Sequence, residues 1–166
     1  MSQHIEFITA QQKDLELIVN TYNLSIPGRM ATADLEPVSV ESKKEWFNTH
    51  NPGTRPILLI QFDGNYAGWL SYTSFYGRPA YQGTAEVSIY LETEYQGKGI
   101  GRIGIQYAEK MAPQLGISNL LAFVFAHNSA SMKLFLSEGF QKWAHFPGIA
   151  KMDEHLRDLI ILGKKI

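Results

Sequence analysis

Apolar and polar residues alternate in some stretches of the chain and recur at helical spacing in others. Alternation around Ile5 and Phe7 predicts a short strand. Thr9 follows it and is expected to cap a helix, because apolar residues recur every three or four positions between residues 15 and 22. The first elements are therefore expected to be a strand followed by a helix.

The next stretch, residues 25–37, lacks this periodicity. Pro27-Gly28 predicts a turn, and the high density of polar residues is typical both of functional loops and of solvated connectors. Ser39 is then expected to cap a second helix that ends near His50, before a break at Asn51-Pro52-Gly53.

A hairpin pattern occupies the middle of the chain. Apolar runs at residues 57–60 and 66–72 flank Asp63-Gly64-Asn65, which favours a tight turn between antiparallel strands. A loop at residues 75–81 should lead into a third strand at 84–91.

Helices and strands are expected to alternate in the remaining part. Apolar residues at every fourth position predict a helix that stops before Pro113. The apolar run 120–125 predicts a fully buried strand. A short helix should open at Asn128 or Ser129 and end at Gly139.

Two final strands are expected, at residues 140–146 and 159–163. The complete order, β-α-α-β-β-β-α-β-α-β-β, predicts an α/β protein with a mixed sheet and helices on both faces.

Composition narrows the class of protein. The 166 residues suit one domain, residues 1–166, and a net charge of −1 with interspersed signs provides no attraction for nucleic acid. The chain has no cysteine, which excludes disulfides and thiolate chemistry and fits a cytoplasmic location. No basic segment precedes an apolar one near residue 1 and no run of about 18 apolar residues occurs, so neither secretion nor membrane contact is expected.

A glycine-rich turn, Gln96-Gly97-Lys98-Gly99-Ile100-Gly101, lies between a predicted strand and a predicted helix, with Arg102 behind it. Glycine allows positive φ and close approach to a ligand, while the first amides of a helix have no intrahelical acceptor. Together with the side chains of Lys98 and Arg102, these amides predict a site for a phosphate or pyrophosphate.

Sequence spacing alone leaves the ligand of this turn open. Gly99 to Gly104 matches the dinucleotide pattern G-x-G-x-x-G, but strand 120–125 ends without an acid for a ribose, which counts against NAD. No Gly-Lys-Ser or Gly-Lys-Thr is present, so a P-loop is excluded. The alternative is that the glycine-rich turn only connects the strand to the helix, although such a connection does not require the basic side chains of Lys98 and Arg102.

With Gln96, Gly99 and Gly101, the turn resembles the signature of the GNAT superfamily of acetyl-CoA-dependent N-acetyltransferases, Gln/Arg-x-x-Gly-x-Gly/Ala. The resemblance covers nearly the whole chain and is strongest for the phosphinothricin acetyltransferase group, in residues 32–37, 78–81, 84–90, 128–131 and 138–140. It implies a GNAT fold, in which a mixed, largely antiparallel sheet of six or seven strands is splayed in the middle and flanked by about four helices. It also implies a homodimer.

The resemblance implies acetyl-CoA as co-substrate and no metal. The amides of residues 96–101 would hold the pyrophosphate, and the pantetheine arm would lie along residues 89–91 like an extra strand. Asn128 would bind the pantetheine, cap the helix that follows, or do both. The implied cofactor-binding residues are Ile89, Tyr90, Leu91, Gln96, Gly97, Lys98, Gly99, Ile100, Gly101, Arg102, Asn128 and Ser131.

Acetyl transfer requires a neutral amine, a polarised thioester carbonyl and a stabilised leaving thiolate. Glu86 is the candidate base, because burial in an apolar strand would raise its pKa, although a structural glutamate is the alternative. A backbone N–H near Leu91 would polarise the carbonyl. Family members place a tyrosine or histidine proton donor where this chain has Phe135. The leaving thiolate must therefore be protonated by water or another side chain, or be stabilised by the helix dipole.

The resemblance to this group implies that the acceptor is the primary amine of a small amino acid or analogue, such as phosphinothricin, methionine sulfoximine or methionine sulfone. Another small primary amine is the alternative. Its pocket is expected in the loop 29–36, the segment 72–81 and residues 151–158. Arginines would clamp a carboxylate or phosphinate and tyrosines would wall the side chain. The predicted substrate-binding residues are Arg29, Thr32, Glu36, Tyr72, Tyr76, Arg78 and Tyr81.

Two rival functions remain. Phe135 is compatible with a module that holds coenzyme A without turnover, and the G-x-G-x-x-G match is compatible with a nucleotide oxidoreductase.

Overall fold

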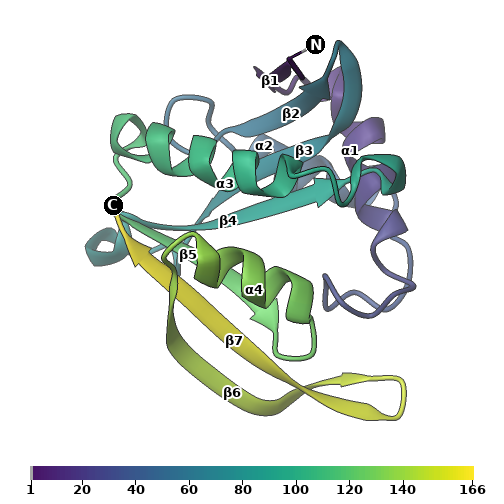
Figure 1. Ribbon diagram of the computed structural model, residues 1–166, viewed down its shortest axis with the longest axis vertical. Coiled ribbons are helices and arrows are strands. Elements are labelled where there is room, and N and C mark those ends of the chain that lie inside the picture. Colours follow the sequence, from purple (N-terminus) through teal and green to yellow (C-terminus); the bar gives the residue numbers. More distant parts are fainter. Residues whose placement is uncertain (1) are drawn as a thin grey trace.

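The computed structural model describes residues 2–166, which form one seven-stranded sheet in the order β1-β2-β3-β4-β5-β7-β6 (Figure 1). Only β4 and β5 are parallel, and all other neighbours are antiparallel. The strands are β1 (Ile5–Thr9), β2 (Ile57–Phe62), β3 (Asn65–Ser74), β4 (Thr84–Leu91), β5 (Asn119–Phe125), β6 (Gln141–Met152) and β7 (His155–Lys165). The helices are α1 (Leu15–Leu24), α2 (Lys44–Asn48), α3 (Ile100–Met111) and α4 (Ser129–Ser137).

The helices form one layer on each side of the sheet (Figure 1). Helices α3 and α4 cover the face that carries Leu70, Tyr72 and Val87, which belong to the larger apolar core. Helices α1 and α2 cover the opposite face, where a smaller cluster surrounds Trp69. Because successive side chains of a strand point to opposite faces, β3 and β4 each supply both layers.

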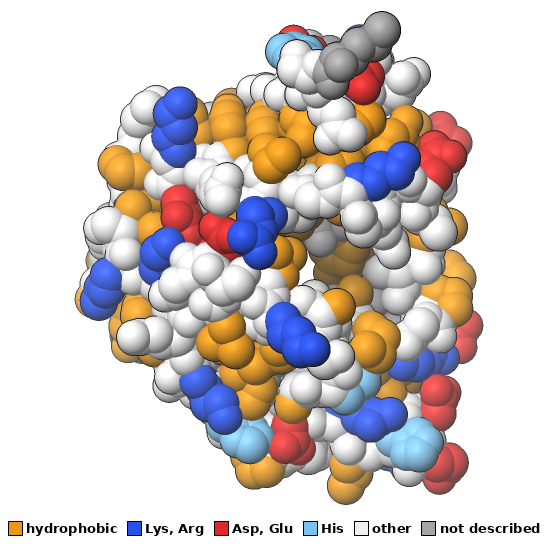
Figure 2. Space-filling model, viewed as in Figure 1, with side chains coloured by type: hydrophobic (Ala, Val, Ile, Leu, Met, Phe, Trp, Pro, Cys, Tyr) orange, Lys and Arg blue, Asp and Glu red, His pale blue; other side chains and the backbone are white. Residues whose placement is uncertain are grey.

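Strands β4 and β5 begin side by side and then diverge (Figure 1). Their parallel register comprises only three pairs, from Thr84 and Asn119 to Glu86 and Leu121. The sheet is therefore split beyond Glu86 into a fork between β4 and β5. In the same view the surface is hollowed between α3 and α4, with hydrophobic side chains at the back of the hollow (Figure 2).

The predicted order of elements and the mixed, splayed sheet are confirmed. The hairpin turn has positive φ at Asp63 (49°) and Gly64 (81°), as a two-residue turn between twisted strands requires. Helix α3 gives way at Met111 to a 3₁₀ turn that contains Pro113, and Gly139 follows α4 in the left-handed conformation at φ 88°.

Three sequence predictions are wrong in detail. Thr9 is the last residue of β1 and caps nothing; a 3₁₀ turn precedes α1, and the Gln11 N–H donates to the Asp14 carboxylate at 2.8 Å. Strand β5 is not fully buried, because Phe123 is exposed. Strands β6 and β7 extend well beyond residues 140–146 and 159–163, so that residues 151–158 form the end of a long hairpin that projects past α4 (Figure 1).

None of the helices formed by residues 2–166 is long and apolar enough to cross a membrane.

Candidate active site

Glu86 lies at the point where the fork begins. It is the last residue of β4 that is paired with β5, and its side chain points to the α1 and α2 side of the sheet. Burial raises the pKa of the Glu86 carboxyl from 4.5 to about 7. No ion pair formed within residues 2–166 includes Glu86. A carboxylate with this pKa can take up a proton near neutral pH.

A cavity of about 240 Å³ opens above Glu86. Side chains from two neighbouring strands form its floor, and because side chains alternate, they come from every second residue. Helix α1 and the segment around α2 form its sides. The lining residues are Ile18, Val19, Tyr22, Val38, Lys43, Trp46, Trp69, Ser71, Thr73, Glu86, Ser88 and Tyr90.

Four aromatic rings make a continuous wall of this cavity. Trp69 stacks on Tyr90 with 4.8 Å between the ring centroids, and its indole N–H donates to the Ile18 carbonyl at 3.0 Å. Trp46 meets Trp69 edge-on at 5.7 Å, and Tyr22 meets Tyr90 edge-on at 5.1 Å. Rings packed against one another in this way have few alternative positions, so the wall is rigid.

Two side chains of the loop 25–37 hold the Tyr22 hydroxyl in place by hydrogen bonds. It accepts a hydrogen bond from Thr32 and donates one to the Asp34 carboxylate. Burial, followed by the bond to Asp34, raises the pKa of Tyr22 to about 12, so this phenol stays protonated. Thr32, predicted as a substrate-binding residue, therefore contacts Tyr22 and is absent from the cavity lining.

Three consecutive carbonyls fasten the same loop across the fork. The Arg29 oxygen lies 2.8 Å from His127 Nε2, the Met30 oxygen accepts from Asn128 Nδ2 at 3.2 Å, and the Ala31 oxygen accepts from the Tyr90 hydroxyl at 3.3 Å. His127 and Asn128 follow β5, whereas Tyr90 belongs to β4. The loop thus bridges the two diverging strands.

Backbone groups of β4 face the fork. The Glu92 N–H donates to Ala67 of β3 at 2.8 Å, and in an antiparallel pair alternate residues bond to the same neighbour. The N–H and C=O groups of Ile89 and Leu91 therefore point away from β3, towards the gap. The expected pairing of an amide-bearing arm along residues 89–91 would use these groups.

The glycine-rich turn has the predicted geometry. Gly97 and Gly99 have φ of 72° and 80°, a left-handed conformation that favours glycine, and α3 starts directly afterwards at Ile100. No atom lies within 4 Å of where a Cβ would be built on either glycine, so the space above the turn is open. Gln96 to Gly99 are exposed. Open amides at the start of a helix fit a pyrophosphate.

Side chains near the turn differ in their availability. Lys98 lies over the rings of Tyr95 and Phe62, at 5.5 and 5.9 Å from the centroids. Arg102 points to α4, where it pairs with Glu138 at 3.2 Å and donates to Ser137 at 3.1 Å. Lys98 is thus free to meet an anion, while Arg102 already has a carboxylate partner.

Asn128 caps α4. Its Oδ1 accepts from the Ser131 N–H at 3.2 Å, so Ser131, another predicted cofactor residue, lies in the first turn of that helix. The predicted capping role of Asn128 is confirmed, and its amide Nδ2 is directed to the loop carbonyl of Met30. Within residues 2–166, no cluster of three or more His, Cys, Asp or Glu side chains is placed to hold a metal.

Comparison with known proteins identifies the family. Residues 19–140 match the model of the acetyltransferase (GNAT) family. The chain belongs to this family. A Bacillus subtilis (strain 168) protein, YwnH, is 49% identical over 158 residues, 95% of this chain and 96% of its own, and carries the provisional name phosphinothricin acetyltransferase. An L-methionine sulfoximine/L-methionine sulfone acetyltransferase of Pseudomonas aeruginosa is 27% identical over 90% of this chain and 87% of its own.

Solved structures agree with this assignment. A crystal structure provisionally named as a phosphinothricin N-acetyltransferase superimposes with a TM-score of 0.92 at 48% identity, covering 99% of this chain and 98% of that one. A GNAT phosphinothricin acetyltransferase from Sinorhizobium meliloti in complex with acetyl-CoA has the same fold, with a TM-score of 0.89, 23% identity, and coverage of 100% and 89%.

Within this GNAT fold, one predicted substrate residue is wrong. Tyr72 is fully buried on the α3 side of the sheet, where its hydroxyl donates to the Ala108 carbonyl at 3.0 Å. Ser71 and Thr73, its neighbours in β3, line the cavity instead. The reason is the two-residue period of a strand, which sends Tyr72 to the opposite face from Glu86.

The other predicted substrate residues lie outside the cavity lining. Arg29 pairs with Asp153 at 3.1 Å and donates to the Leu35 carbonyl at 2.8 Å. Glu36 and Arg78 are exposed. Tyr76, which is 74% exposed, and Tyr81 form an outer aromatic cluster with Phe75, with centroids 5.6 to 6.0 Å apart.

Phe135 is part of the core in this member of the family. It is buried and meets Phe140 edge-on at 5.1 Å. The ring offers no proton to a leaving thiolate, as the sequence already indicates.

Several cavity residues are not among those that the sequence predicts: Tyr22, Lys43, Ser71, Thr73 and Ser88. Ser88 could have been found, because it lies two residues after Glu86 in the same strand and so shares its face. Lys43 and Tyr22 come from helical segments remote in sequence, and no local pattern links them to Glu86.

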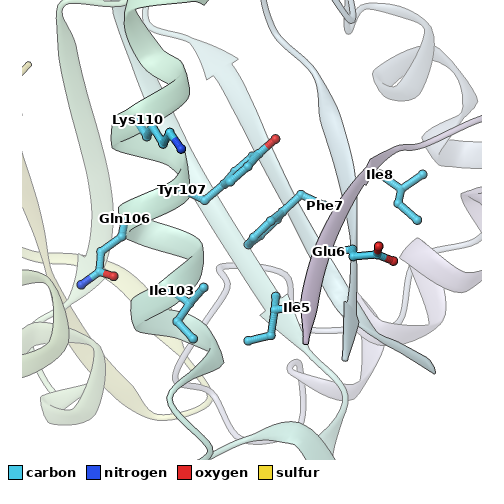
Figure 3. A pocket seen from close by; sticks show the side chains of 8 residues that line it. All are labelled: Ile5, Glu6, Phe7, Ile8, Ile103, Gln106, Tyr107 and Lys110. Atoms are coloured by element: carbon cyan, nitrogen blue, oxygen red, sulfur yellow. The ribbon is translucent and has the colours of Figure 1, made fainter. Parts of the chain in front are cut away.

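A second hollow, of about 560 Å³, lies on the α3 side of the sheet between α3 and the edge strand β1 (Figure 3). There the ring of Phe7 stacks on that of Tyr107 with 3.9 Å between the centroids. None of the predicted site residues lines it, and Glu6 points away from the space between strand and helix (Figure 3). The cavity above Glu86 is therefore the candidate acceptor site.

Proposed function

We propose that residues 1–166 form one acetyl-CoA-dependent N-acetyltransferase domain that acetylates the primary amine of a small amino acid or analogue. Phosphinothricin, methionine sulfoximine and methionine sulfone define the type of acceptor. Membership of the GNAT family supports the reaction, and the named activities of the relatives support the class of acceptor.

One observation carries this proposal: Glu86 lies where the fork of the sheet meets the aromatic cavity. A donor entering along the fork and an acceptor entering through the cavity would therefore meet beside one carboxylate. Productive transfer requires such a meeting within about 3.5 Å between the reacting atoms.

Acetyl-CoA is the donor that fits the fork. The left-handed glycines with open space above them suit the pyrophosphate, and the backbone groups of Ile89 and the N–H of Leu91 suit the amides of a pantetheine arm. The complex of the Sinorhizobium meliloti protein with acetyl-CoA supports this donor. Lys98 would add a positive charge beside the pyrophosphate. The side-chain amide of Asn128, which the loop carbonyl of Met30 holds in place, would orient the pantetheine arm.

Glu86 would act as general base. An ammonium group loses a proton to the Glu86 carboxylate, and the neutral nitrogen attacks the thioester carbon. A new C–N bond forms, the C–S bond breaks, and the nitrogen loses its second proton to water, while coenzyme A leaves as a thiolate that water protonates. The Leu91 N–H would donate to the carbonyl oxygen as negative charge develops there.

Exposed apolar side chains support a homodimer. Trp143, Phe146, Ile149 and Leu156 all lie on the β6–β7 hairpin and are exposed, and several exposed apolar side chains on one hairpin are typical of protein interfaces. We propose a cytoplasmic homodimer, in keeping with the lack of cysteine. Sedimentation equilibrium would test it, and a monomer at all concentrations would contradict it.

A thiol-release assay tests the enzymatic proposal. Purified protein is mixed with acetyl-CoA and a panel of amino acids and simple amines, and free coenzyme A is followed with a thiol reagent while mass spectrometry identifies the acetylated product. We expect release with small amino acids, and a fall of about a hundredfold or more in turnover for Glu86→Gln. Calorimetric titration should show that Glu86→Gln binds coenzyme A as wild type does.

The outcomes separate the rival functions. Binding of coenzyme A without thiol release from any amine would indicate a binding module. Binding of NAD in place of coenzyme A would indicate an oxidoreductase. Full turnover by Glu86→Gln would remove Glu86 from the mechanism while leaving the transferase intact.

A further inference from the structure

The lining of the acceptor cavity contains two charged side chains. Glu86 is its only carboxylate and Lys43 its only cation, among twelve lining residues that are otherwise apolar, aromatic or hydroxylic. An α-amino acid carries the opposite pair of charges, an ammonium and a carboxylate. One cavity of about 240 Å³ holds both protein groups, so their separation is on the scale of a small molecule.

Lys43 is poised at the side of this cavity. It is half-buried between the 3₁₀ turn 41–43 and α2, and its ammonium lies 5.7 Å from the centroid of the Tyr22 ring. The Tyr22 ring is fixed in turn by Thr32, Asp34 and Tyr90. The attraction between an ammonium and the face of a fixed aromatic ring gives the ammonium a preferred position.

Lys43 has no carboxylate partner among residues 2–166. Its neighbour Lys44 pairs with Glu41, but none of the ion pairs formed within residues 2–166 includes Lys43. Lys43 and Glu86 are thus too far apart to pair with each other, although both line the same cavity. Two unpaired charges of opposite sign in one small cavity are electrostatically complementary to a zwitterion.

The arginines expected to bind a carboxylate do not fill this role. Arg29 is engaged by Asp153, with Nε at 3.1 Å, and by the carbonyls of Ile26 and Leu35. Arg78 is exposed on the loop before β4 and does not line the cavity. Lys43 is the cation that the cavity itself supplies.

We propose that Lys43 binds the carboxylate of the acceptor and thereby selects amino acids over amines that lack a carboxylate. This inference rests on the proposed acetyltransferase function and assigns its specificity to one residue. The acceptor lies across the aromatic wall with its amine at Glu86 and its carboxylate at Lys43. Lys43 is a specificity residue and takes no part in proton transfer.

The test compares two acceptors that differ only in the carboxylate, L-methionine sulfone and 3-(methylsulfonyl)propan-1-amine. For each, kcat and KM are measured with wild type, Lys43→Met, Lys43→Arg and the control Lys44→Met. Methionine keeps the length of the lysine stem and removes its charge. Because the two amines differ in basicity, the informative quantity is how each variant changes the ratio of the two kcat/KM values.

We expect Lys43→Met to lower kcat/KM for methionine sulfone about tenfold or more, through KM, because a partly solvated ion pair is lost. The same variant should change kcat/KM for the amine less than about twofold. Lys43→Arg should restore most of the preference, and Lys44→Met should behave as wild type. Equal melting temperatures would show that Lys43→Met remains folded.

Two results would overturn the assignment, and they are distinguishable. If wild type acetylates methionine sulfone but Lys43→Met leaves the ratio unchanged, Lys43 does not read the carboxylate, whereas the acetyltransferase proposal stands. If wild type releases no coenzyme A with any amino acid of the panel, both proposals fail.

Discussion

Tyr90 on β4 and Asn128 after β5 donate hydrogen bonds to adjacent carbonyls of one loop, those of Ala31 and Met30. The two donors stand on opposite sides of the fork in the sheet. The loop 25–37 therefore depends on both strands for its position, and it in turn positions Thr32 and Asp34 around Tyr22.

Tyr90→Phe tests this dependence. The variant keeps the stacking on Trp69 and loses the hydroxyl that bonds to Ala31, so we expect the free energy of unfolding to fall by about 1 kcal/mol. The KM for the acceptor should rise a few-fold and hydrogen exchange should accelerate in residues 29–36. Tyr66→Phe is the control, because its hydroxyl bonds to Thr21 and Leu17 of α1 and not to the loop. Unchanged exchange in Tyr90→Phe would show that the loop is held by other contacts.

The raised pKa of Glu86 has a consequence for stability. Below pH 4.5 this carboxyl is protonated in both the folded and the unfolded chain and contributes nothing to the pH dependence. Between pH 4.5 and 7 the unfolded chain ionises first, so the ionisation of Glu86 progressively favours unfolding. Glu86→Gln, which cannot ionise, should therefore exceed wild type in unfolding free energy by up to about 3 kcal/mol above pH 7.

Urea unfolding at several pH values measures this difference. It should be largest at pH 8 and should shrink towards zero near pH 4.5. Glu154→Gln, at the exposed end of the β6–β7 hairpin, serves as control and should show no such pH-dependent gain. A difference that stays constant with pH would mean that the pKa of Glu86 is not raised.

Gly99 is expected to be essential for the glycine-rich turn. Its φ of 80° strains any side chain, although no atom lies within 4 Å of the position of a Cβ. We expect Gly99→Ala to cost about 1–2 kcal/mol of conformational strain and to weaken coenzyme A binding about tenfold or more. Gly28→Ala, where φ is not left-handed, is the control. Calorimetric titration with coenzyme A should show a loss for the first variant only.

Tyr72 and Ser71 separate stability from substrate binding. Tyr72→Phe removes a buried hydrogen bond to Ala108, so the free energy of unfolding should fall by about 1 kcal/mol with no change in KM. Ser71→Ala changes the cavity floor on the other face and should alter the KM for the acceptor. A changed KM in Tyr72→Phe would contradict the assignment of these faces.

Local patterns predicted most of the scaffold. The Asp63-Gly64 turn, the strand 84–91 and the stop before Pro113 all follow from residues close together in the sequence, whose turn and helix preferences the fold respects. The long β6–β7 hairpin was underestimated because its middle is irregular: the register shifts between Phe146 and Ala150, around Pro147 and Gly148. Where the hydrogen-bond ladder between two strands is irregular, apolar and polar residues do not alternate regularly along the sequence.

The candidate site divides in the same way. Glu86 and the glycine-rich turn were predicted because a lone acid in an apolar strand and a run of glycines are local signals. Tyr72 is predicted in the pocket as part of the segment 72–81, although a shift of one residue reverses the face. Lys43 and Tyr22 reach the cavity only through the packing of α1 and α2 on the sheet, which no local pattern contains.

The last pair between β4 and β5 joins Glu86 to Leu121. The same hydrogen-bond ladder thus decides where the fork opens and where the carboxylate stands. A slip of β4 by one residue would turn a different side chain towards the cavity and send the carboxylate into the layer beneath α3. The opening of the fork and the position of the Glu86 carboxylate therefore cannot be varied independently, and a change of acceptor is most readily achieved by replacing the side chains that α1 and α2 bring to the cavity.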